Sequence, residues 1–200
     1  MSKSAKGTLI MIGLGAITVL LAAVAIALRP GGDLVHWLVR GTALVGYAAT
    51  FLAILSSAYM RELYRALGRP FLWGHHVLSV SGLILLALHP VGVAIDAASA
   101  AVFVPRFDSW MIFFQLGGRP ALYLMWIASL GALLRRSWKK GWRTIHLLNY
   151  LAFLLGTVHA VLIGTDLSQP FLRLIPIAMA LVVGTVFVRK RLGRKRAVKK

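Results

Sequence analysis

Cysteine is absent from this chain of 200 residues. Its absence excludes disulfide bonds, thiol chemistry and cysteine-held iron–sulfur clusters, and it excludes a heme attached covalently through a C-x-x-C-H motif. Acidic residues are almost as scarce, since aspartate and glutamate together number 5. Charged residues of both signs make up 14% of the chain, whereas they make up about 25% of an average soluble domain. Apolar residues account for 59% and the mean hydropathy is +0.80, so an ordinary soluble fold is excluded.

Long apolar runs are what the sequence does contain. Several of them approach or exceed ~20 residues, the length that an α-helix needs to cross a bilayer, and a further run at 119–134 is somewhat short. We therefore predict an all-α membrane protein, in which residues 1–200 form a single membrane domain built as a six-transmembrane-helix bundle. The predicted spans are residues 8–28, 36–59, 71–95, 119–134, 142–164 and 170–188, followed by a basic cytoplasmic tail at 189–200.

Two of the connections between these runs are longer than the others. Residues 60–70 are expected to form a short loop with three arginines. Residues 96–118 form the longest connection, and their aromatic stretch FDSWMIFFQL is expected to lie in the membrane interface. The first run is longer than the apolar core of a signal peptide, about 7–15 residues, so we expect it to be retained as a helix.

The net charge of +18 is distributed unevenly along the chain. In a soluble protein such a charge would indicate nucleic acid, but here the basic residues lie between apolar runs, so we expect a lipid bilayer and no nucleic acid as partner. Most of the 23 lysines and arginines fall in segments that six spans place on one side of the membrane. The positive-inside rule then predicts an integral protein of the cell (inner) membrane with both termini in the cytoplasm. The acids expected on the outer side are Asp33, Asp96, Asp108 and Asp166.

Histidines interrupt two of the apolar runs. The run GHHVLSVSGLILLALHP holds His75, His76 and His89. The run WRTIHLLNYLAFLLGTVH holds His146 and His159. Burying an ionisable residue inside a membrane span is costly, so its presence indicates a function. His75 and His89 are 14 residues apart, which corresponds to ~21 Å along a helix. His146 and His159 are 13 residues apart, which corresponds to ~19.5 Å, so the histidines of the two runs fall at two matching depths.

Two matching depths favour two stacked bis-histidine sites, and imidazole is a common axial ligand of heme iron. We predict two b-type hemes held without covalent attachment. The inner heme iron would be ligated by His75 and His146. The outer heme iron would be ligated by His89 and His159. His76 remains an alternative to His75, although His75 shares a helix face with His89 more closely. Ordinary polar contacts between helices are the other interpretation of these histidines.

His146 and His159 do not lie on the same face of a regular helix. Thirteen residues leave His146 and His159 about 140° out of phase on a regular helix, so we expect a local distortion or a supercoil between them, or an offset between the two hemes. Gly156 would make that distortion easier. Gly74, Gly82 and Gly156 would also let a porphyrin or another helix approach closely, and helix packing is the ordinary explanation for small residues in spans.

Arginines near the ends of the spans are predicted to meet the anionic heme propionates. Arg69 and Arg143 are the candidates at the inner face, and Arg40 and Arg119 at the outer face. The alternative is that these side chains only extend to the interface or set the topology. His36 lies at an outer interface and is expected to be structural.

These motifs carry a resemblance to a known family. The patterns H-x13-H and H-x12-H, with W-R-x-x-H-L-L-x-Y from Trp142 to Tyr150, resemble the ferric-reductase-like transmembrane domain over about residues 51–188. That family includes ferric reductases, NADPH oxidases and the heme-binding membrane subunit of the periplasmic methionine sulfoxide reductase system. The resemblance implies a six-helix bundle, b-type hemes and electron transfer across the membrane. By this match the four ligands are the histidines assigned above.

The expected function is that of a di-heme b-type electron-transfer protein. No G-x-G-x-x-G nucleotide motif follows the last run, so we expect a separate donor, either a cytoplasmic flavoprotein reductase or a quinol, and a flavin or quinone on that partner or at the membrane surface. The acceptor would be a ferric chelate or a periplasmic redox partner docked on residues 96–118. We expect no catalytic side chain in the chain itself, because the redox chemistry belongs to the iron. A non-redox transporter or assembly factor would need acids beside the histidines, but all five acids are predicted to lie in loops.

Overall fold

The computed structural model describes residues 3–28, 30–68 and 70–198. Regular structure in these residues is helical throughout, and none of them lies in a strand. Among them, five helical segments are long and apolar enough to cross a membrane, and the prediction of an all-α chain with membrane-length helices is confirmed. These segments are Gly7–Ala27, Leu34–Ala58, Leu72–Asp96, Trp142–Ile163 and Pro170–Lys190.

The remaining predicted span corresponds to helix α6, Gly118–Leu133. Its 16 residues correspond to about 24 Å of helix, which is shorter than a hydrocarbon core of about 30 Å. A sixth crossing of the membrane therefore stays a prediction.

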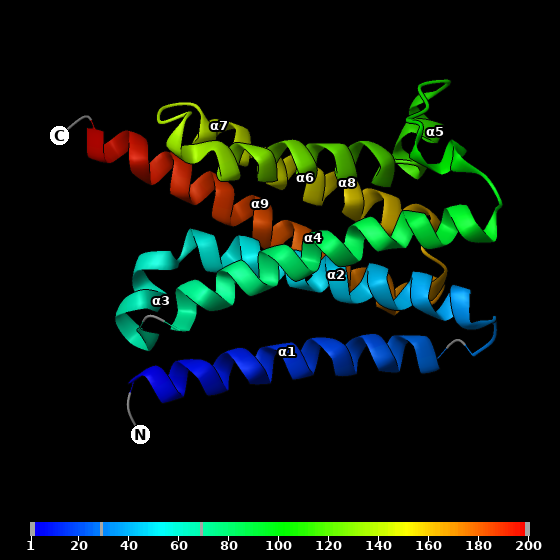
Figure 1. The fold of residues 1–200 in the computed structure, drawn as a ribbon, viewed down its shortest axis with the longest axis horizontal. Coiled ribbons are helices and arrows are strands. Elements are labelled where there is room, and N and C mark those ends of the chain that lie inside the picture. Colours follow the sequence, from blue (N-terminus) through cyan, green and yellow to red (C-terminus); the bar gives the residue numbers. More distant parts are fainter. Residues whose placement is uncertain (1–2, 29, 69, 199–200) are drawn as a thin grey trace. The chain divides into compact units, whose positions relative to one another are not determined.

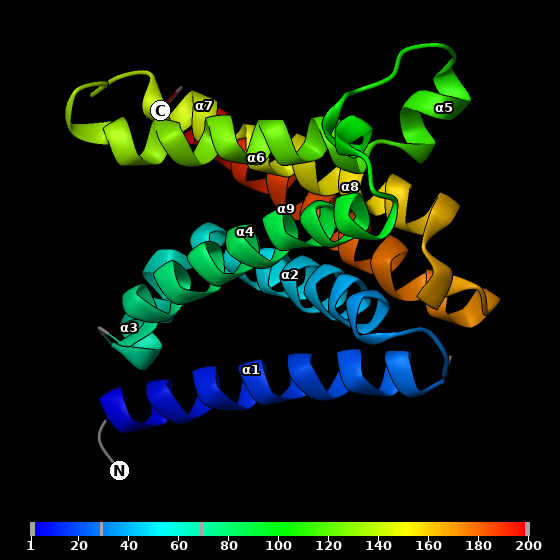
Figure 2. The same ribbon diagram turned by 45° about the vertical axis from the view of Figure 1, so that its right-hand side comes forward.

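The chain divides into two compact units, shown in Figures 1 and 2. The first unit comprises the chain up to Gly92 together with Thr185 onward, and the second comprises Val93–Gly184. The boundaries fall inside helices α4 and α9. A single membrane domain stays a prediction.

The first unit contains α1 (Lys3–Ala27), α2 (Leu34–Ala58), α3 (Met60–Leu67), most of α4 (Pro70–Asp96) and the end of α9 (Pro170–Val198). Helices α2 and α4 approach closely through glycines. A Cβ atom at Gly46 would lie 2.9 Å from Cγ of Leu86, and one at Gly82 would lie 2.9 Å from Oγ1 of Thr50. Close backbone approach through small residues is the usual packing device of membrane helices, and Gly82 serves it here.

Helix α2 begins two residues before the predicted start of its span. The side chain of Asp33 caps it by accepting a hydrogen bond of 2.9 Å from the backbone N–H of His36. A capping aspartate satisfies one of the donors that the first helical turn leaves without an intrahelical partner. A structural role for the His36 side chain stays a prediction.

The prediction of a loop at residues 60–70 is wrong for most of that segment, because residues 60–67 form helix α3. Glu62 lies in the first turn and Arg65 in the last. Each charge is opposite in sign to the partial charge of the helix dipole at that end, which stabilises the helix. Gly68 ends the helix with a φ of +78°, a conformation that glycine adopts without steric cost. Lys190 of α9 reaches this region, with Nζ 3.2 Å from Oε1 of Glu62 and 4.4 Å from the ring centre of Tyr59.

Replacing Gly68 by alanine is expected to lower the free energy of unfolding by about 1–2 kcal/mol, because a Cβ atom is strained at positive φ. Thermal unfolding followed by circular dichroism in detergent measures the change. Gly141→Ala is the matched control, since Gly141 has a φ of −93° and a Cβ there would meet nothing within 4 Å. Equal losses of stability in the two variants would contradict the assignment of Gly68 as the residue that ends α3.

The second unit contains the short helices η1 (Ala100–Phe103) and α5 (Trp110–Gln115), then α6, η2 (Leu134–Arg136), α7 (Trp142–His146), α8 (Leu148–Ile163), η3 (Thr165–Leu167) and the first part of α9. Helices α6 and α8 lie side by side in both views (Figures 1 and 2). Ala128 of α6 and Ala152 of α8 are 0% and 1% exposed, with Phe153 buried beside them. Small residues on both helices give this unit its core.

The distortion expected between His146 and His159 is present, but not at Gly156. Helix α7 ends at His146, Leu147 lies in a turn, and α8 begins at Leu148. A Cβ atom at Gly156 would meet nothing within 4 Å. The interruption directly follows the first histidine of the pair, so the two histidines belong to different helices.

Candidate functional site

His75 lies near the start of α4 and is partly buried in the first unit. Its Nδ1 atom is 2.9 Å from Oγ of Ser56 in α2. The Ser56 hydroxyl already donates its proton to the carbonyl of Ala53, at 2.8 Å. The serine oxygen therefore accepts from His75, which requires the proton of the imidazole to be on Nδ1.

His89 lies two-thirds of the way along α4, directly before Pro90, and α4 continues through this proline to Asp96. Its Nδ1 atom is 3.1 Å from the carbonyl oxygen of Val39 in α2. A carbonyl oxygen only accepts, so Nδ1–H is the donor. Both histidines of α4 are thus held against α2 by the same ring nitrogen.

His146 is the last residue of α7 and belongs to the second unit. Its Nδ1 atom is 3.1 Å from the carbonyl oxygen of Ala128 in α6. The side-chain amide nitrogen of Asn149 is placed 3.3 Å from the same ring nitrogen. Because the Ala128 carbonyl requires Nδ1–H, the amide of Asn149 presents its oxygen here, and the two orientations of an amide have the same shape.

His159 lies in α8, where its Nδ1 atom is 2.6 Å from the carbonyl oxygen of Gln115. Gln115 ends α5, and carbonyls in the last turn of a helix have no intrahelical partner. Gly118, the first residue of α6, leaves space beside the ring: a Cβ atom there would lie 3.0 Å from both Nε2 and Cδ2 of His159. The imidazole is therefore fixed on one side by α5 and accommodated on the other by a glycine.

The four histidines share one arrangement. Each is partly buried, and each has Nδ1 bonded to an acceptor within its own unit. With the proton on Nδ1, the basic lone pair of the ring is on Nε2, the tautomer that binds a metal. No group of three or more histidine, aspartate or glutamate side chains in the described residues could hold a bare metal ion. Heme iron needs only two protein ligands, and the ligation of heme by these histidines stays a prediction.

His76 differs from its neighbour. It is exposed, and its ring lies 5.7 Å from that of His75, centre to centre, at an interplanar angle of 57°. The hydrogen bond to Ser56 belongs to His75. This difference favours His75 over His76 as the histidine held in a fixed orientation.

The arginines predicted to meet propionates have other partners in the described residues. Arg40 is 4% exposed, and one of its NH2 groups donates to the carbonyl of Ile26 near the end of α1, at 3.2 Å. Arg143 is exposed and lies over the ring of Trp142, at 5.5 Å from its centre. Arg69 lies outside the described residues. The contacts of Arg40 and Arg143 indicate structural roles, and a role toward propionates stays a prediction.

Arg119 supports the segment that precedes α6. Its NH1 group donates to the carbonyl of Val104 at 2.6 Å, and the hydroxyl of Tyr123 donates to the carbonyl of Phe103 at 2.8 Å. Two side chains of α6 thus fasten the end of η1. The predicted interaction of Arg119 with a propionate is not tested by these contacts.

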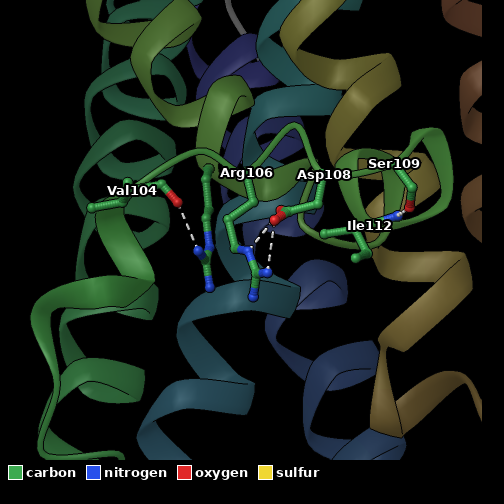
Figure 3. Close-up of polar contacts among 6 residues, drawn as sticks. Val104, Arg106, Asp108, Ser109 and Ile112 are labelled. Atoms are coloured by element: carbon green, nitrogen blue, oxygen red, sulfur yellow. Dashed lines mark hydrogen bonds and ion pairs between the residues drawn. The ribbon is translucent and has the colours of Figure 1, made fainter.

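The same segment has its own polar contacts, drawn in Figure 3. Arg106 and Asp108 form two parallel hydrogen bonds of 2.8 Å and 3.0 Å, and the bond from Arg106 lowers the pKa of the Asp108 carboxyl below its ordinary value. The hydroxyl of Ser109 accepts from the backbone N–H of Ile112 and caps α5. Local hydrogen bonds therefore order the segment whose last helix carries the acceptor for His159.

Residues 34–166 match a family model described as a domain of unknown function, DUF8596. The match spans well over half of the chain. The chain belongs to this family. All four histidines and all four Nδ1 acceptors lie inside the DUF8596 region. A comparison with curated proteins and one with solved structures found no match.

Several residues of the DUF8596 region that support the histidines were not singled out from the sequence. Ser56 carries a hydroxyl in an otherwise apolar run, and Asn149 stands three residues after His146, so the residue type at each position could have indicated a polar contact. Gly118 gave a weaker indication, as half of a glycine pair. The carbonyls of Val39, Ala128 and Gln115 gave none, because every residue carries a carbonyl.

Proposed function

We propose that this protein is a b-type membrane cytochrome that carries electrons between the two faces of a membrane. An inner heme would be held by His75 and His146, and an outer heme by His89 and His159. When bound, each heme supplies one-electron chemistry at its iron, and two hemes at different depths provide a path through the bilayer. The observation that carries the proposal is the shared arrangement of the four histidines, each with Nδ1 bonded and the lone pair on Nε2.

The residues around the histidines have defined tasks in this proposal. Ser56 and the carbonyls of Val39, Ala128 and Gln115 hold the Nδ1 protons and thereby orient the rings. Such hydrogen bonds also raise the basicity of the ligating nitrogen. The apolar residues of the helices would shield the ligand atoms from water.

The proposal is tested by purifying the full chain from cells supplied with heme. We expect a reducible b-type spectrum and about two hemes per chain by the pyridine hemochrome assay. A colourless protein that is folded by circular dichroism would refute the proposal. The predicted orientation, with both termini in the cytoplasm, is tested separately by the accessibility of terminal tags in intact cells.

A narrower form of the proposal makes this chain the membrane subunit of a periplasmic oxidoreductase, similar to that of the methionine sulfoxide reductase system. The supporting observation is the surface of residues 104–114, where Phe107 is 75% and Trp110 80% exposed. Exposed aromatic residues gathered in one segment are typical of interfaces with partners. Phe107→Ser with Trp110→Ser should abolish co-purification with a periplasmic partner while the heme content stays unchanged. Unchanged co-purification would favour direct reduction of a ferric chelate.

Replacing Ser56 by alanine is expected to keep both hemes and to raise the midpoint potential of the inner one. Without the hydroxyl, the Nδ1–H group of His75 loses its acceptor, the imidazole becomes a weaker donor, and ferric iron is stabilised less. The expected shift is on the order of 40 mV, equivalent to one net hydrogen bond of about 1 kcal/mol.

Potentiometric titration of the heme absorbance measures this shift. Ser57→Ala is the matched control, because the Ser57 hydroxyl donates to the carbonyl of Ile54, at 2.9 Å. Its two potentials should equal those of the unmodified protein. A shift of the same size in both variants would exclude a specific effect through His75.

A further inference from the structure

A hollow of about 540 Å³ opens where α6 is joined to α7. It is lined by Ser137, Trp138, Lys139, Lys140, Gly141 and Ile145. The backbone around it is turned back on itself, because the N–H groups of Ser137 and Trp138 both donate to the carbonyl of Leu134, at 3.0 Å and 2.8 Å. The hollow is therefore formed by an ordered turn and not by an extended loop.

The hollow is strongly basic. Lys139 and Lys140 contribute to its wall, and Arg135, Arg136 and Arg143 flank it in sequence, all of them exposed. The sequence has no acidic residue between Asp108 and Asp166, so no carboxylate of α6, α7 or α8 neutralises these charges. Those two aspartates precede α6 and follow α8, at the ends of these helices remote from the turn. These five cations, with no carboxylate on the helices that flank the turn, would attract an anion from outside the chain.

Two exposed apolar side chains lie at or near the hollow in the sequence: Trp138, which lines it, and Leu133, four residues before Ser137. Trp138 is 53% exposed and Leu133, at the end of α6, is 79% exposed. Tryptophan is enriched at the level of lipid headgroups, where its ring is apolar and its N–H is polar. A site that combines cations, the hydroxyl of Ser137 and exposed apolar side chains matches a molecule with an anionic head and an apolar body.

We propose that this hollow binds the phosphodiester headgroup of an anionic phospholipid. Lys139 and Lys140 pair with the phosphate oxygens, the Ser137 hydroxyl donates to one of them, and the acyl chains lie along Leu133 and Trp138. Basic pockets at the membrane surface are the established setting for such headgroups. The residues that line the hollow include no histidine and none of the arginines predicted to contact propionates.

The test uses the purified full chain in micelles containing equal amounts of phosphatidylglycerol and phosphatidylcholine, with bound lipid counted by native mass spectrometry. Lys139→Gln with Lys140→Gln is expected to reduce bound phosphatidylglycerol by roughly tenfold, and Lys139→Arg with Lys140→Arg should restore it. The matched control is Arg61→Gln with Arg65→Gln, which removes the same charge from the exposed residues of α3. Its loss should stay below about twofold.

Three outcomes would overturn the proposal. Equal losses in the two glutamine variants would mean that lipid follows net charge alone. Displacement of phosphatidylglycerol by excess inorganic phosphate would make the hollow a site for free phosphate. Full retention of phosphatidylglycerol in Lys139→Gln with Lys140→Gln would exclude a lipid site and favour a soluble protein partner for these charges.

Discussion

Replacing His89 by alanine is expected to remove about half of the heme, and replacing His159 by alanine should remove the same spectral component. Each substitution deletes one of the two axial ligands proposed for the outer iron, and a low-spin bis-histidine site does not persist with one imidazole. His75→Ala and His146→Ala should both remove the other component. Heme content and low-temperature absorbance of the four purified variants give the measurement.

His76→Ala is the control for this series, because His76 is adjacent to His75 but exposed and without the bond to Ser56. It should retain both hemes. If His76→Ala loses the inner heme while His75→Ala keeps it, the ligand has been assigned to the wrong neighbour. If His89→Ala and His146→Ala deplete the same component, the pairing by equal depth is wrong, and so is the membrane topology inferred from the loop charges.

Apolar length was sufficient to predict most of the helices, because a run of about 20 apolar residues has few stable alternatives to a helix. The ends of the helices depend on individual polar groups. Helix α2 begins earlier than predicted because Asp33 caps it, and α3 replaces a predicted loop because Gly68 permits a sharp ending. Both residue types are common at helix ends and can be recognised in the sequence. Whether they begin or end a helix depends on the backbone conformation of the neighbouring segment.

The candidate site was predictable only in part. Histidine is costly inside an apolar run, so the four histidines proposed as ligands stood out from the sequence alone. Their acceptors did not, because main-chain carbonyls carry no side-chain signal. Arg40 lies inside a predicted span, and the structure shows one NH2 group of its guanidinium donating to the carbonyl of Ile26, while its contact with a propionate stays a prediction. A buried arginine needs hydrogen-bond acceptors, and the end of a neighbouring helix supplies them as well as a propionate would.

The outer site offers a further test that leaves all histidines in place. Gly118→Ala is expected to lower the occupancy of the outer heme by roughly tenfold while the inner heme is retained, because overpacking costs about 1–3 kcal/mol. The new methyl group would lie 3.0 Å from Nε2, the atom proposed to bind iron. The ring has little room to move away, since its other nitrogen is held 2.6 Å from the carbonyl of Gln115.

Gly184→Ala is the matched control, because a Cβ atom at Gly184 would meet nothing within 4 Å. Alanine favours a helix over glycine by about 0.5–1 kcal/mol, so neither substitution lowers the intrinsic stability of its own helix, and retention of the inner heme shows that Gly118→Ala is folded. The measurement is the ratio of the two heme components in the purified variants. If Gly118→Ala keeps the outer component at full occupancy and unchanged potential, Nε2 of His159 does not face the iron, and the outer site must take its ligand from elsewhere in the chain.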